Sequence, residues 1–264
     1  MKWGRMCLVV FGWRSRPGLT IAVAANRDEF LKRPTAHAAF WADAPGILAG
    51  RDLTAGGTWL GVTRHGRVAF LTNHRDPRSH LEGAPSRGAL VAEFLRGEET
   101  PGDFLRRNEK RAVIYNGFHL VVSDLAELWY FTNTEGRPQR LAPGIHGLSN
   151  GPLDDPWPKT RRSVERLARA LEDPVSLSPE PLLDLLGDPS RAPDAELPST
   201  GVPLEWERLL SSVFIEGGGS GYGTRSSTVL FVTEDRRVRF VERTFEAGRP
   251  VPPDVDLSFV LTGP

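Results

Sequence analysis

Short apolar runs separated by turn residues are the feature that most limits the folds open to this chain. Leu8–Trp13 and Leu19–Ala25 are aliphatic and aromatic runs, and the five residues between them include a proline and a glycine. This pattern is typical of antiparallel strands joined by a hairpin. It returns at Thr58–Thr63 and Arg67–Thr72, with another short apolar run at Gly46–Gly50. Four or five strands are therefore expected before any helix.

Helical spacing of apolar residues appears in the middle of the chain. Trp157–Leu171 is the clearest case, because Val164, Leu167 and Leu171 share one face while arginines line the other. The other predicted helices are Arg87–Leu95, capped by Ser86, then Pro101–Asn108 and Pro181–Leu186. The later predicted strands are Phe118–Ser123, Glu127–Thr132, Ser212–Ile215, Ser226–Thr233, Arg237–Phe245 and Leu257–Leu261.

Strands come first along the chain, helices follow, and further strands close it. This order predicts an α+β layered fold with antiparallel sheets. We expect one domain over residues 1–264, with a long surface loop at 187–203 where Pro, Asp and Ser accumulate.

Composition excludes several classes of function. The chain has 33 basic and 33 acidic residues, so no overall field attracts nucleic acid. Its apolar runs fall far short of the roughly 18 residues of a membrane span, and the first is shorter than the signal-peptide core of about 7–15 residues. With one cysteine there is no disulfide within the chain, so we expect a cytoplasmic protein.

Cys7 follows an internal methionine, Met6. If translation starts at Met6 and that residue is removed, Cys7 carries a thiol with a pKa of about 8.5 and an α-amino group with a pKa of about 7.7–8.0. The amine then takes the proton of its own side chain, as in N-terminal nucleophiles. With Met1–Arg5 still attached there is no free amine, and a cysteine on an apolar strand is also a common small core residue. Both interpretations stay open.

A polar run, Asn26–Glu29, ends the strand expected to pair with that of Cys7. The pairing brings Arg27 and Asp28 close to Cys7. An arginine lowers the pKa of a nearby thiol, and an aspartate can hold an amine or orient a substrate. The alternative is a cluster of surface ion pairs at a strand end.

Asn73 and His74 likewise follow an apolar strand. A neutral amide suits an oxyanion because it donates hydrogen bonds without neutralising the nucleophile, although asparagine is also a common turn residue. Asn150 lies in a turn-rich segment, 146–151, that fixes the backbone before the long helix. His74 is a candidate base or ligand, but no second His or Cys lies at metal-ligand spacing, so no metal site is expected.

The glycine-rich segment 217–223 precedes Arg225 and a strand. It lacks the ending of a phosphate-binding loop. We interpret it as a lid that delivers Arg225 to a site, since glycines absorb large backbone changes. A plain flexible connector is the alternative.

Several motifs together resemble the NRDE family, whose animal member is the transport and Golgi organisation protein. They are Met-Cys-Leu-Val-Val-Phe at 6–11, Ala-Asn-Arg-Asp-Glu-Phe at 25–30, Ala-Gly-Arg-Asp with Gly-Gly-Thr-Trp-Leu-Gly within 49–61, Thr-Asn at 72–73, Gly-Leu-Ser-Asn at 147–150, Pro-Trp-Pro-Lys at 156–159 and Tyr-Gly-Thr-Arg-Ser-Ser-Thr at 222–228. The resemblance covers nearly the whole chain.

This resemblance implies the four-layer αββα sandwich of N-terminal-nucleophile hydrolases. Cysteine amidohydrolases of that group, similar to penicillin V and bile-salt acylases, use a terminal Cys, an Arg and Asp on the next strand, an Asn and a late Arg. The matching catalytic positions here are Cys7, Arg27, Asp28, Asn150 and Arg225, with Asn73 as a further candidate. The expected ligand contacts are Asn26, His74 and Tyr222.

Two functions of different class follow. The first is an amidohydrolase that needs no cofactor and cleaves a small-molecule amide through an acyl-enzyme on Cys7. The second is a non-catalytic carrier of haem or another amphipathic acyl or lipid ligand, because animal members of the family are linked to haem trafficking and lipid or acyl-CoA metabolism. His74, His146 or Cys7 would then hold the iron.

Overall fold

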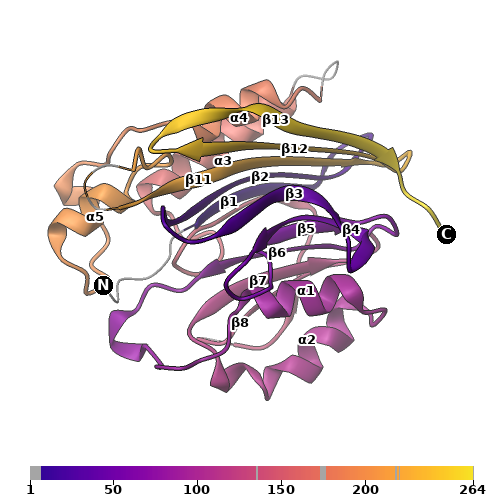
Figure 1. Ribbon diagram of the computed structural model, residues 1–264, viewed down its shortest axis with the longest axis horizontal. Helices are drawn as coiled ribbons and strands as arrows, with labels where there is room; N and C mark the ends of the chain where they lie inside the picture. The colour runs from indigo at the N-terminus through magenta and orange to yellow at the C-terminus, as the bar shows by residue number, and fades with distance from the viewer. Residues whose placement is uncertain (1–6, 135, 173–176, 218, 220, 264) are drawn as a thin grey trace.

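The computed structural model describes residues 7–134, 136–172, 177–217, 219 and 221–263, which form two sheets flanked by helices (Figure 1). Every strand pairing among these residues is antiparallel. The α+β class with two antiparallel sheets is therefore confirmed.

The first sheet has six strands, in the spatial order β10-β1-β2-β11-β12-β13. Their bounds are β10 (Gly144–Leu148), β1 (Cys7–Arg16), β2 (Leu19–Phe30), β11 (Tyr222–Thr233), β12 (Arg237–Glu246) and β13 (Arg249–Val260). The second sheet has seven strands in chain order. They are β3 (Thr35–Trp41), β4 (Ala44–Asp52), β5 (Leu60–Thr63), β6 (Val68–Asn73), β7 (Phe118–Ser123), β8 (Leu128–Thr132) and β9 (Gln139–Arg140).

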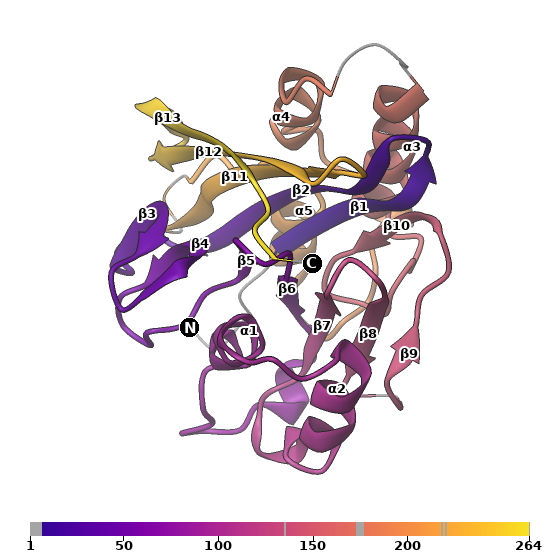
Figure 2. The same ribbon diagram turned by 90° about the vertical axis from the view of Figure 1, so that its right-hand side faces the viewer.

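The helices lie outside the two sheets. Within the described residues the α-helices are α1 (Gly88–Arg96), α2 (Pro101–Glu109), α3 (Pro158–Glu172), α4 (Glu180–Leu186) and α5 (Leu204–Leu210). Figures 1 and 2 show α3 and α4 on the outer side of the first sheet, and α1 and α2 on the outer side of the second. No described helix combines the length and the apolar character needed to cross a membrane.

Three apolar clusters hold these layers together. One fills the space between the sheets and includes Phe11 and Phe70. A second joins the second sheet to α1 and α2, with Phe94 as a member. A third joins the first sheet to α3 and α4, with Leu167 and Leu186 among its members. The order of packing is thus helices, sheet, sheet, helices.

Strand β1 is covered on both faces. Val9 and Phe11 belong to the cluster between the sheets, whereas Leu8 and Val10 belong to the cluster under the helices. Alternate residues of a strand point to opposite faces, so a strand buried on both sides needs an unbroken apolar run. This explains why the segment after Cys7 is apolar at every position.

Helix α3 runs along β1 with its first turn near the start of that strand. Gly147, the register partner of Val10, lies so close to α3 that an added Cβ would be 2.4 Å from Cγ2 of Thr160. At the other end, Nη1 of Arg16 donates to the carbonyl of Leu171 at 3.3 Å. The first turn of α3, which follows Pro158, therefore lies toward the end of β1 where Cys7 lies, and the helix runs from there toward Arg16.

Local signals predicted most elements correctly. The hairpin of β1 and β2 is present, as is the β5–β6 hairpin, and the predicted helices at α1, α2, α3 and α4 form within one or two residues of their expected bounds. The segment 187–203 is irregular apart from a short 3₁₀ turn at Asp194–Glu196.

Other expectations were wrong. Ser212–Ile215 is not a strand, because its backbone bonds elsewhere: Phe214 N–H donates to the carbonyl of Asp188, and the carbonyl of Val213 accepts from the side chain of Asn26. Helix α5 just before it was not expected.

The expected N-cap of α1 and the expected set of strands also need correction. Arg87 rather than Ser86 occupies the N-cap of α1, without a side-chain cap. Strand β3 was not among the expected strands, and β10 occupies part of the segment 146–151, where turns were expected.

Candidate functional site

Strand ends from both sheets meet at a small pocket beside Cys7. Cys7 opens β1 and stands opposite Arg27 of β2, while Asn73 closes β6 of the other sheet. These three side chains, with Glu29, Trp59 and Arg87, contribute to the walls of a cavity of about 50 Å³. The pairing of β1 with β2 thus brings Arg27 to Cys7 as expected, and Asn73 joins them across the two sheets.

The thiol of Cys7 is buried, with 6% of the residue exposed. Burial, followed by the negative charge of Asp28, raises the pKa of Cys7 to about 12. A hydrogen bond from the Asp28 backbone and the charge of Arg27 act in the opposite direction but are outweighed. In a chain that continues on the N-terminal side of Cys7, this thiol is neutral at physiological pH.

Arg27 is held by neighbours on three sides. Its Nη1 donates to Oγ1 of Thr35 at 3.0 Å, its Nη2 lies 3.6 Å from Oε2 of Glu29, and the guanidinium lies 4.3 Å from the ring centroid of Trp59. Burial lowers the pKa of Arg27, with Glu29 opposing that shift. The arginine is fixed in the pocket wall, where it presents positive charge at a set position.

Asp28 lies on the helix side of β2, opposite in direction to Arg27. Its Oδ1 accepts a hydrogen bond from Oγ1 of Thr224 at 2.7 Å. Its Oδ2 is buried without a hydrogen-bond partner among the described residues. Burial raises the pKa of Asp28 to about 6, although the charge of Lys159 lowers it. A carboxylate with one unsatisfied oxygen at a buried site is a candidate partner for a cationic group.

Lys159 is the residue that sequence reasoning missed. It lies in the first turn of α3, it is 1% exposed, and its Nζ has no hydrogen-bond partner in the part of the chain that the structure describes. Burial lowers the pKa of Lys159 to about 8, and Asp28 is the strongest opposing influence. The available signal was compositional: lysine is rare here, at four in 264 residues, and this one ends the Pro-Trp-Pro-Lys motif.

Asn150 is hydrogen-bonded to the backbone beside the pocket. Its Nδ2 donates to the carbonyl of Asn73 at 2.5 Å, and its own carbonyl accepts from Arg75 N–H at 2.9 Å. The neighbouring Ser149 Oγ donates to the carbonyl of Cys7 at 3.3 Å. Asn73 lines the Cys7 pocket, whereas Asn150 is buried behind it.

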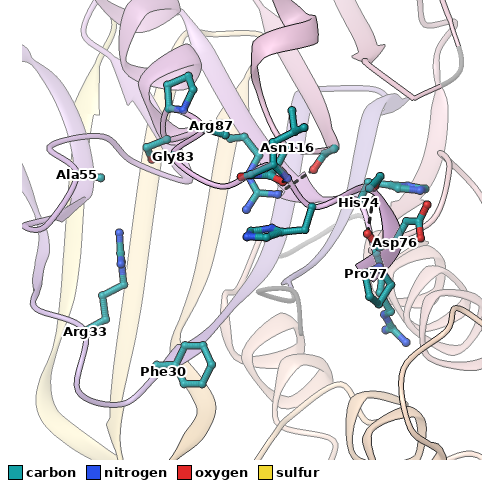
Figure 3. Close-up of a pocket in the computed structure, with 17 residues that line it drawn as sticks. Phe30, Arg33, Ala55, His74, Asp76, Pro77, Gly83, Arg87 and Asn116 are labelled. Atoms are coloured by element: carbon teal, nitrogen blue, oxygen red, sulfur yellow. Dashed lines mark hydrogen bonds between the residues drawn. The ribbon is translucent and has the colours of Figure 1, made fainter. Parts of the chain in front are cut away.

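A larger pocket of about 490 Å³ adjoins the first one through Ser86 and Arg87, which line both. Figure 3 shows Arg33 and Ala55 on one side of it and His74, Asp76 and Pro77 on the other. The Arg87 guanidinium donates to the carbonyl of Gly117 at 2.8 Å. A small molecule held in the larger pocket would reach the Cys7 pocket past Arg87.

His74 is held by a chain of side chains. Its Nδ1 is 3.2 Å from Nε2 of His119, whose Nδ1 is 2.8 Å from the hydroxyl of Tyr130. Burial lowers the pKa of His119 to about 3, so that ring is neutral at physiological pH. His74 thus lines the larger pocket in a fixed orientation, and its role as a ligand contact stays a prediction. Among the described residues, no group of three or more His, Cys, Asp or Glu side chains is arranged for a metal ion.

Three of the predicted site residues lie elsewhere. Arg225 sits at a bulge of β11, and its Nη1 donates to the carbonyls of Phe30, Leu31 and Arg33. It lines another pocket, of about 110 Å³, which shares Trp59 with the Cys7 pocket. The arginine therefore holds the turn after β2. Two residues of the predicted lid, Gly218 and Ser220, lie outside the described residues.

Asn26 and Tyr222 have packing roles in the structure. The Asn26 amide donates to the carbonyls of Leu186 and Val213 and accepts from Ser227, which ties β2 to the helix layer. Tyr222 is buried, with its ring 5.3 Å from that of Phe30. Neither lines the Cys7 pocket or the larger pocket.

Comparisons with known proteins agree on one family. A family described as "Transport and Golgi organisation 2" matches residues 6–247. A relative from Bos taurus named "Transport and Golgi organization protein 2 homolog" is 33% identical over 263 residues, covering 93% of this chain and 95% of its own. The Homo sapiens protein of the same name is 32% identical, covering 90% and 93%. The Drosophila melanogaster "Transport and Golgi organization protein 2" is 30% identical, covering 93% and 94%.

Proposed function

The chain belongs to the Transport and Golgi organisation 2 family, as its motifs predicted, and we propose that it acts as a cysteine amidohydrolase of the N-terminal-nucleophile type. The observation that carries this proposal is the meeting of Cys7, Arg27 and Asn73 at one small pocket that opens toward a larger one. The packing order of helices, sheet, sheet and helices supports the αββα architecture implied by the motifs. The cytoplasmic location expected from the single cysteine remains part of the proposal.

The first chemical step needs a free α-amino group on Cys7. In a chain that begins at Cys7, the amine accepts the proton of Sγ, and the thiolate attacks the carbonyl carbon of a substrate amide. The negative charge that develops on the carbonyl oxygen receives a hydrogen bond from the Asn73 side chain. We favour Asn73 over Asn150 for this role, because Asn73 lines the pocket while Asn150 anchors the Asn73 carbonyl.

The remaining steps return the enzyme to its starting form. The carbon–nitrogen bond breaks as the leaving amine takes a proton from the α-ammonium group, and a thioester on Cys7 remains. Water then attacks the thioester carbonyl carbon and gives up a proton to the α-amine. The carbon–sulfur bond breaks, the α-ammonium returns the proton to Sγ, and the carboxylic acid is released. Asp28 is suited to hold the α-ammonium, since one of its carboxylate oxygens is buried without a partner among the described residues.

Residues in front of Cys7 keep the site inactive in this proposal. With the α-nitrogen in a peptide bond, there is no amine to take the proton, and burial holds the pKa of Cys7 at about 12. Freeing the amine supplies both a base and a positive charge next to the thiol, and a nearby positive charge lowers a thiol pKa. Exposure of the Cys7 amine is then the activating event.

A carrier function is the second candidate, and the larger pocket favours it. That pocket has a volume of about 490 Å³ and His74 on its wall, so it offers space and a nitrogen ligand to an amphipathic molecule such as haem. A carrier would need neither a free amine nor the Cys7 thiol.

Expression from Met6 separates the two functions. The protein is made with translation starting at Met6 and, separately, with Met1–Arg5 retained, and intact mass reports the N-terminus. Each form is incubated with fluorogenic N-acyl amides of short and long acyl chain. We expect hydrolysis only by the form that begins at Cys7, and a loss of roughly 10³-fold or more in Cys7→Ala.

The opposite result would favour the carrier. If the Cys7-led form cleaves none of these amides, while haem binds equally to the wild type and Cys7→Ala but not to His74→Ala, the hydrolase proposal is wrong. The single cysteine makes Cys7→Ala a clean variant, because no other thiol remains in the chain.

A further inference from the structure

Lys159 violates three ordinary preferences of its residue type. Its ammonium group is buried, its Nζ makes no hydrogen bond to a described residue, and it lies in the first turn of a 15-residue helix. A buried amine without partners costs free energy, and the positive end of a helix dipole adds to that cost. A lysine that persists in such surroundings points to a specific opposite charge nearby.

Other charged groups around Lys159 are already matched. Arg75 forms a buried ion pair with Glu207 of α5, and the Glu207 carboxylate also accepts from the N–H and hydroxyl of Thr200. Cys7 is a neutral thiol in this chain. Of the titratable groups facing Lys159, namely Asp28, Cys7, Arg75 and Glu207, Asp28 is the one left to balance it.

Asp28 shows the complementary pattern. The charged groups near it are Lys159, Arg27 and Glu29, and Arg27 is already paired with Glu29 at 3.6 Å. Its other close partner is the neutral hydroxyl of Thr224. Neither the Lys159 ammonium nor Oδ2 of Asp28 makes a hydrogen bond to a described residue, and the charge of each shifts the pKa of the other toward its ionised form.

The course of α3 brings the two together. Helix α3 begins near the start of β1, because Gly147 of β10 lets the first turns of the helix pack closely against the sheet. Asp28 lies at the corresponding end of β2, on the side of that strand that faces the helices. We propose that Lys159 is a positioning residue, whose ammonium is the counter-charge that keeps Asp28 ionised next to Cys7. This rests on the proposed function, in which the ionised Asp28 holds the α-ammonium of Cys7.

Two NMR titrations of the full chain test this without any substrate. Labelling with [ε-¹³C]lysine gives few signals, because the chain has four lysines, and the Lys159 signal is the one absent from Lys159→Met. In Asp28→Asn we expect the Lys159 midpoint to fall by about one pH unit or more, as the opposite charge is removed. Asp256→Asn removes a surface carboxylate paired with Arg239, and it should leave the midpoint unchanged.

The reciprocal titration uses [γ-¹³C]aspartate. The Asp28 signal is identified by its absence from Asp28→Asn, and Lys159→Met should raise its midpoint by the same amount, since the coupling of two sites is mutual. Lys159→Arg retains the charge and should restore the wild-type midpoint.

An unchanged Lys159 midpoint in Asp28→Asn, or an unchanged Asp28 midpoint in Lys159→Met, overturns the inference. The Lys159 signal is also absent from Lys159→Arg, so the first measurement decides the matter even if Lys159→Met fails to fold. Neither titration depends on amide hydrolysis, so failure here and failure of the proposed function are separate results.

Discussion

At the scale of single residues, the structure buries several ionisable groups whose pKa values are displaced in ways that stability measurements can detect. Glu242 of β12 is one that lies away from the Cys7 pocket. One of its carboxylate oxygens accepts from Ala38 N–H at 2.6 Å, and the other lies 3.4 Å from the Thr228 hydroxyl. Burial raises the pKa of Glu242 from 4.5 to about 7. The folded protein therefore holds a proton that the unfolded chain releases.

This shift predicts a pH dependence with a definite sign. Because the folded pKa is raised, the stabilising contribution of Glu242 is complete below pH 4.5 and is lost as the pH rises through about 7. Between about pH 5 and pH 8, the free energy of unfolding of the wild type should fall by roughly 2–3 kcal/mol more than that of Glu242→Gln. Urea denaturation at a series of pH values measures this difference. The exposed Glu98→Gln is the control, and wild-type and Glu242→Gln curves that run parallel would contradict the prediction.

Part of the site was predictable residue by residue, and part was not. The approach of Arg27 to Cys7 follows from the length of one hairpin, which local turn signals specify. The contribution of Asn73 was suggested only because its strand also ends in polar residues. Lys159 was missed because a helix sequence shows an arginine-lined face but cannot show that one lysine at its start is covered by other elements. Arg225 was placed in the site by the interpretation of the glycine-rich segment as a lid and by resemblance. Its hydrogen bonds to the turn after β2 depend on a bulge that no local signal marks.

At the scale of elements, the placement of α3 depends on how closely it approaches β10. Gly147 permits that approach, since a Cβ there would lie 2.4 Å from Cγ2 of Thr160 and 2.7 Å from Cγ2 of Val164. Both neighbours are β-branched and stiff, so they cannot easily turn aside. The helix would have to move away from the sheet.

Substitution of Gly147 tests how closely α3 must pack against β10. We expect Gly147→Ala to lower the free energy of unfolding by about 1–3 kcal/mol, the usual cost of overpacking. Gly46→Ala is a matched control, because a Cβ at Gly46 meets nothing within 4 Å. Urea denaturation of both variants measures the effect. A Gly147→Ala protein as stable as Gly46→Ala would show that α3 tolerates the displacement.

Elements built from neighbouring residues were easier to predict than those that depend on distant partners. Hairpins such as β5–β6 can be predicted from the turn residues between their strands. Strand β10 pairs with β1 across more than a hundred residues, so its sequence, which is rich in glycine and turn residues, gave no comparable signal. The segment Ser212–Ile215 carries apolar residues like a strand, but Asn26, Asp188 and Thr224 take up its backbone groups.

At the scale of the whole molecule, the two sheets share one apolar cluster. Phe11 of the first sheet lies 5.1 Å from Phe70 of the second, measured between ring centroids, and both side chains are fully buried. Neither sheet could keep its inner face covered if the other unfolded. This arrangement favours a single cooperative unit, as expected for one domain.

Cooperative unfolding can be observed with two probes placed in different sheets. Cys7 is the sole cysteine and starts β1, so its alkylation by iodoacetamide in increasing urea reports the first sheet. In a variant whose other tryptophans are replaced by phenylalanine, only Trp41 and Trp129 remain. Their fluorescence reports the second sheet. We expect the two transitions to share one midpoint and one slope, because exposure of either inner face exposes the common cluster. A fluorescence transition that precedes alkylation would mean that the second sheet unfolds alone, and the chain would then contain two units of stability.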